Sequence, residues 1–149
     1  VRLWHRNDPT GYRDLPTGAG PARGVAFDRA GEYLAAAASG PTPAAVVWST
    51  ADLREPVARI PVQKKEYGPS VAFAAAADRL AVAGPDGVRL FAPPFRSPAA
   101  TIRPATEPAV VAVSPDGRLV AAGVGEDVGV YAADGTRVAN LTGHRGPVL

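Results

Sequence analysis

A pattern of apolar anchors recurs along this chain at a nearly constant interval, and such a period constrains the fold more than any other feature of the sequence. Three units each contain an apolar run, a turn and a second apolar run: GVAFDRAGEYLAAAA from Gly24, SVAFAAAADRLAVAG from Ser70 and VVAVSPDGRLVAAGV from Val110. Their equivalent anchors, Phe27, Phe73 and Val113, are 46 and 40 residues apart. The interval indicates one structural unit repeated along the chain.

Two further sets of residues share this period. An aromatic residue closes a later apolar run at Trp4, Trp48, Phe91 and Tyr131, with spacings of 44, 43 and 40 residues. A third run is anchored at Leu15, Ile60, Ile102 and Leu141, with spacings of 45, 42 and 39 residues. Periods of about 40 to 45 residues are typical of propeller blades, in which each unit is a four-stranded sheet.

Each unit predicts four short strands separated by turn residues. In the first unit these strands are residues 25–27, 33–38, 45–48 and 57–62. Ser114-Pro115-Asp116-Gly117 and Asp134-Gly135 supply turns, because proline suits the first central position and glycine tolerates positive φ. The small side chains of residues 35–38 suit a sheet covered on both faces; a short alanine-rich helix is the alternative.

Three segments resemble the WD40 repeat family: VRLW at 1–4, SPDGRLVAAG at 114–123 and LTGHRGPV at 141–148. The resemblance implies an all-β propeller fragment of four-stranded antiparallel blades, with about three full blades and parts of two flanking ones. Residues 1–23 would end one blade, 24–62, 70–103 and 110–142 would form three blades, and 143–149 would lead into the next. A propeller closes with about four to eight blades, so a larger parent protein is expected to supply the others.

The resemblance also implies structural positions, several of which depart from the family's pattern. Trp4, Trp48, Phe91 and Tyr131 match the aromatic that ends the third strand, and the last three are expected to be buried between blades. His144 matches the family's histidine before the first strand, and we interpret it as structural. The full units lack that histidine, and packing and turns must therefore contribute more of the stability.

The sequence offers no catalytic, metal or cofactor motif. It has no cysteine, and its two histidines, His5 and His144, are too few for a histidine-built metal site. Glycines 18, 20 and 24 and glycines 123, 125 and 129 miss the spacing of a dinucleotide loop by one residue. We therefore expect no enzyme and no cofactor.

Charge and hydropathy narrow the partners. The net charge is +2 and the arginines are scattered, which argues against nucleic acid. No apolar run is long enough to span a membrane and no signal peptide begins the chain, so we expect a cytoplasmic protein without a membrane partner. The abundance of alanine and arginine suggests a bacterial source.

The loop before the second full unit is the candidate contact segment. Lys64, Lys65, Glu66 and Tyr67 combine charge with an aromatic ring, as interfaces often do, although a plain solvated loop is the alternative. The leading hypothesis is a non-catalytic scaffold or recognition module that binds a protein or peptide within a larger protein. One alternative is a ligand-binding or enzymatic propeller that uses its central channel; another is a partial propeller that self-associates.

Overall fold

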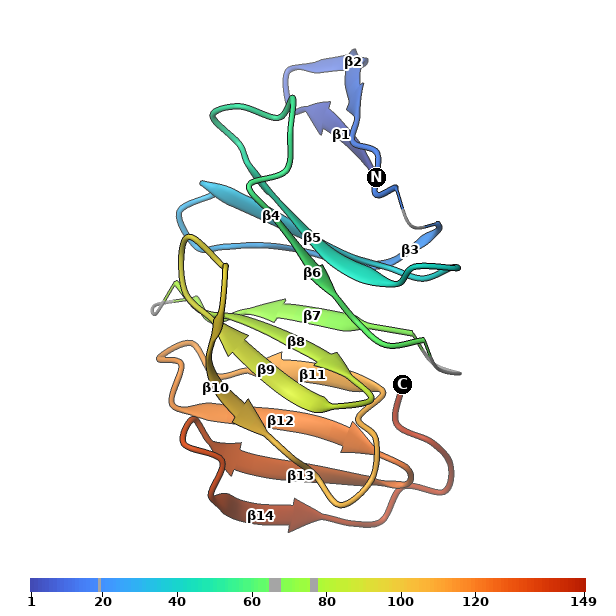
Figure 1. The fold of residues 1–149 in the computed structure, drawn as a ribbon, viewed down its shortest axis with the longest axis vertical. Helices are drawn as coiled ribbons and strands as arrows, with labels where there is room; N and C mark the ends of the chain where they lie inside the picture. Colours follow the sequence, from blue (N-terminus) through green and yellow to red (C-terminus); the bar gives the residue numbers. More distant parts are fainter. Residues whose placement is uncertain (19, 65–67, 76–77) are drawn as a thin grey trace.

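The computed structural model is all-β, and its three four-stranded sheets are stacked like the blades of a propeller (Figure 1). It describes residues 1–18, 20–64, 68–75 and 78–149, and only the backbone of His5 and Pro9. All sheets are antiparallel and each follows the chain order, so neighbouring strands are joined by short loops. The predicted fold class is confirmed, and residues 35–38 lie in a strand, not in a helix.

The strands are named in chain order. A hairpin contains β1 (Arg2–His5) and β2 (Asp8–Asp14). Sheet 1 contains β3 (Ala22–Phe27), β4 (Tyr33–Ala38), β5 (Ala44–Ser49) and β6 (Ala58–Pro61). Sheet 2 contains β7 (Ser70–Phe73), β8 (Leu80–Gly84), β9 (Gly87–Phe91) and β10 (Pro98–Ile102). Sheet 3 contains β11 (Val110–Val113), β12 (Leu119–Val124), β13 (Asp127–Ala132) and β14 (Arg137–Leu141).

The first strand of each sheet is its innermost strand. β3 contacts β7, and β7 contacts β11, whereas β6, β10 and β14 form the outer edges of their sheets. β3 starts three residues earlier than expected, because Ala22 pairs with Ala38 across a register shift that precedes Gly24. β6 is two residues shorter than expected, since Val57 and Val62 only hydrogen-bond beyond its ends.

One packing rule recurs at all three interfaces between successive layers. The aromatic residue near the end of the third strand faces the preceding layer, where it joins an aliphatic residue at the end of that layer's outer strand. The pairs that share an apolar cluster in this way are Leu15 with Trp48, Ile60 with Phe91, and Ile102 with Tyr131. All six side chains are buried, so the expected burial of Trp48, Phe91 and Tyr131 between sheets is confirmed.

The same two positions are exposed at the two ends of the stack. Trp4 in β1 is 56% exposed, because no layer of the chain covers that face of the hairpin. Leu141 at the end of β14 is 53% exposed on the outer face of sheet 3. His144, which follows it, is exposed as well, and its expected structural role stays a prediction.

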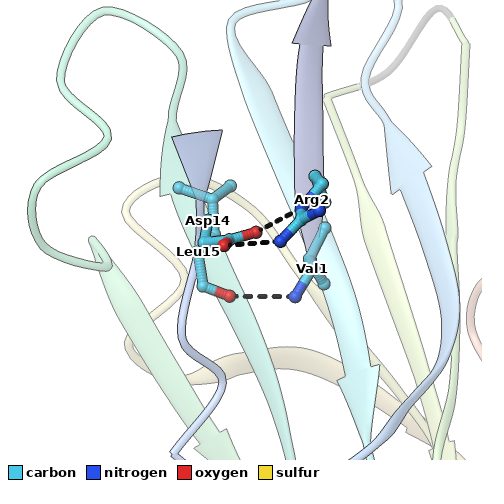
Figure 2. Close-up of polar contacts among 4 residues, drawn as sticks. All are labelled: Val1, Arg2, Asp14 and Leu15. Carbon is cyan, nitrogen blue, oxygen red and sulfur yellow. Dashed lines mark hydrogen bonds and ion pairs between the residues drawn. The ribbon is translucent and has the colours of Figure 1, made fainter. Parts of the chain in front are cut away.

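The β1–β2 hairpin is closed by polar contacts at its open end (Figure 2). Arg2 donates two hydrogen bonds to the carboxylate of Asp14, at 2.8 and 2.9 Å. The nitrogen of Val1 donates to the carbonyl oxygen of Leu15 at 3.0 Å, and the Leu15 N–H donates back to Val1 at 2.8 Å. These contacts hold Leu15 where it packs in the cluster of Trp48.

The turns between first and second strands use side chains to bind backbone N–H groups. Asp28 accepts a hydrogen bond from the N–H of Tyr33 at 2.8 Å, and Ser114 accepts one from the N–H of Leu119 at 2.9 Å. Gly117 takes the positive φ that was expected of it, at 71°. The Ser114 hydroxyl also donates to Asp116 at 2.6 Å, which accepts the Arg118 N–H at 3.0 Å.

We expect Asp116 to make stability depend on pH. The hydrogen bond from Ser114, and then that from the Arg118 N–H, hold the pKa of this carboxyl below its ordinary value. The folded state therefore favours the charged form, and its stabilising effect is present at neutral pH and lost as the pH falls below the ordinary aspartate pKa of about 3.9. Chemical denaturation at a series of acid pH values should show a shallower loss of stability in Asp116→Asn than in the parent. Ser114→Ala, which removes the largest cause, should flatten the profile in the same way, and parallel profiles for all three proteins would contradict the assignment.

Candidate interaction surface

One face of the stack is formed by two kinds of loop: those that join the second strand to the third within a sheet, and those that join successive sheets. These loops gather on the right-hand side of the view in Figure 1. Contacts between them confirm the arrangement: the Ser39 N–H donates to the Pro21 carbonyl at 3.0 Å, and the Val148 N–H donates to the Gly125 carbonyl at 2.8 Å. We call this side the loop face, and its described residues are 15–18, 20–21, 39–43, 62–64, 68–69, 85–86, 103–109, 125–126 and 142–149.

The centre of the loop face is a shallow depression of about 260 Å³, where the innermost strands begin. Its lining residues come from three sheets and the end of the chain: Arg23, Gly24, Pro69, Ser70, Ala109, Val110 and Leu149. The Ser70 hydroxyl accepts a hydrogen bond from the Val111 N–H at 3.3 Å, and Arg23 donates to the Ser39 hydroxyl at 3.3 Å. With one guanidinium, one hydroxyl and otherwise apolar or small residues, this lining suits binding and offers no pair for acid–base chemistry.

A second depression, of about 510 Å³, lies between the β8–β9 turn and the segment that follows β10. Asp86 projects from the turn, and Arg103 and Glu107 line the opposite side. The turn is held tightly, since a Cβ placed on Gly87 would lie only 2.2 Å from the carbonyl oxygen of Ile102. Charged groups of both signs thus stand on a rigid frame around an open hollow.

The predicted contact segment belongs to this face, but most of it lies outside the described residues. Lys64 is described and exposed, whereas Lys65, Glu66 and Tyr67 are not described. Val62 and Pro69, on either side of the segment, are both buried. The described flanks are therefore anchored in the core, and Lys64 stands beside the anchored part on the loop face.

The structure reveals a second polar surface that the sequence analysis missed. A groove of about 380 Å³ runs between the outer strand of sheet 1 and sheet 2, and Arg59, Arg89 and Arg96 line it. Arg89 donates to the Pro61 carbonyl at 2.6 Å, and Arg59 donates to the Thr17 carbonyl. Two of the three arginines thus join neighbouring layers of the stack. These residues come from separate units and occupy no shared repeat position, so no sequence signal connects them.

Other kinds of site were searched for in the described part of the chain. Among those residues, no group of three or more His, Cys, Asp or Glu side chains is placed to hold a metal ion. Within the same residues, no helix is long and apolar enough to cross a membrane.

Comparisons with known proteins add no assignment to this geometry. Neither the models of known protein families nor the curated proteins contain a match to this sequence.

Proposed function

We propose that this chain is a WD40-type propeller segment that recognises a protein or peptide through its loop face. The single observation that carries the proposal is the loop face itself, where loops from every layer converge around two open hollows on a rigid β frame. Loops positioned by a rigid scaffold are a common place for recognition residues.

The chemistry of the hollows supports a peptide as the ligand. The central depression offers apolar and small residues together with Arg23 and Ser70, and the second offers Asp86, Arg103 and Glu107 at its edge. A polar rim around less polar ground is the usual composition of a protein interface. Both hollows are open, as binding an extended segment of another chain requires.

The experiment selects ligands from a random peptide library on the immobilised 149-residue chain. Lys64 and Arg103 are exposed, and the double variant Lys64→Glu/Arg103→Glu should weaken the selected peptides by about tenfold or more, because it reverses two charges at the hollows. Hydrogen exchange with bound peptide should slow in residues 62–64 and 103–109.

The matched control reverses two arginines on the opposite side of the stack. Arg29 and Arg118 are exposed in the loops between first and second strands, so Arg29→Glu/Arg118→Glu makes the same change in net charge. Its affinity for the peptides should stay within about twofold of the parent. Equal losses in the two double variants, or protection of the loops around residues 29 and 118, would overturn the proposal.

A further inference from the structure

The two ends of the stack carry the unmatched halves of one interface. Inside the chain, an aliphatic residue at the end of an outer strand always shares a cluster with the aromatic residue of the next layer. Leu141 is the corresponding aliphatic residue of sheet 3, and Trp4 is the corresponding aromatic residue of the hairpin. Both are more than half exposed, so each lacks the partner that its equivalents have.

The surroundings of these two residues are apolar as well. Trp4 pairs across the hairpin with Tyr12, which is 55% exposed, and the Arg2 guanidinium lies 3.9 Å from the centre of the Tyr12 ring. Figure 2 shows how Arg2 is in turn fixed by Asp14, so the hairpin presents its two rings in an ordered arrangement. Association then loses little side-chain entropy at the hairpin.

On sheet 3, the open face is limited to its outer part. Leu141 pairs with Val128, and Leu119 on the same face is 41% exposed. The inner part is approached by the end of the chain, since a Cβ on Gly123 would lie 2.9 Å from the carbonyl oxygen of Val148. The uncovered area is therefore the area of outer strands, and the hairpin consists of only two strands, both equivalent to outer strands.

We infer that a second copy of this chain packs its β1–β2 hairpin on the outer face of sheet 3. The hairpin and β14 lie at opposite ends of the stack in Figure 1, so one molecule cannot join its own two faces. The contact is consequently head to tail: Trp4 of one copy meets Leu141 of another, as Trp48 meets Leu15 within the chain. It continues an interface that the chain already builds three times, and it is separate from the proposed loop-face function.

The experiment measures association of the 149-residue chain by sedimentation velocity over a range of concentrations. Trp4→Arg blocks the hairpin and Leu141→Arg blocks the face of sheet 3; each should weaken self-association by at least about tenfold, because a buried charge without a partner opposes the contact. Both residues are exposed, so circular dichroism of each variant should match that of the parent.

Mixing the two variants gives the decisive result. Each retains the half that the other has lost, so the mixture should form a one-to-one dimer that cannot grow further. Val57→Arg, at an apolar residue 45% exposed away from both faces, should associate like the parent. A parent that stays monomeric at every concentration, or a mixture that does not restore a dimer, would overturn the inference.

Discussion

Replacing Trp48 by alanine should lower the free energy of unfolding by about 3 to 5 kcal/mol, the usual cost of removing a large buried aromatic side chain. Trp48 is 1% exposed and lies in one cluster with Leu15 and Leu34, between the hairpin and sheet 1. Its removal leaves a cavity that the surrounding strands cannot fill, because their backbones are fixed by the sheet ladders. Denaturant unfolding in dilute solution measures the change.

Trp4→Ala is the matched control for this prediction. It removes the same side chain from the equivalent strand position, but Trp4 is exposed. The expected change is at most about 0.5 kcal/mol, as for most surface substitutions. If Trp48→Ala unfolds at the same denaturant concentration as the parent, the packing of the hairpin on sheet 1 is wrong.

Replacing Phe95 by alanine should be about as destabilising, at about 3 to 5 kcal/mol. Phe95 lies in the loop between β9 and β10, yet it is 1% exposed. Its ring makes edge contacts with Tyr33 of sheet 1, at 5.1 Å between centroids, and with Phe73 of sheet 2, at 6.1 Å. The loop thus inserts an aromatic residue between two sheets and closes that end of their interface.

Thermal and denaturant unfolding of Phe95→Ala measure this contribution, with Phe27→Ala as the control. Phe27 is a phenylalanine of similar size in β3 and is 51% exposed, so its replacement should change stability little. Alanine keeps the Cβ at the positive φ of residue 95, 62°, and the comparison therefore reports the lost ring contacts. A Phe95→Ala protein as stable as Phe27→Ala would show that the loop does not contribute to the core.

The candidate surface was predictable only in part. The sequence directed attention to Lys64 because a charged and aromatic run interrupts the repeat, and Lys64 does lie on the loop face. It gave no indication of Asp86, Arg103 and Glu107 around one hollow, because these residues become neighbours only when the β8–β9 turn packs beside the segment after β10.

The sequence by itself determined the repeating unit, its four strands and the burial of Trp48, Phe91 and Tyr131. Strand alternation, turn residues and period are local signals, and an anchor that recurs in each unit identifies a position that each unit must bury. Only the tertiary structure decided which layer each face meets. Alternation places residues on two faces of a sheet but does not say what covers either face, so the burial of Phe95 and the exposure of Trp4 and Leu141 depend on contacts between layers.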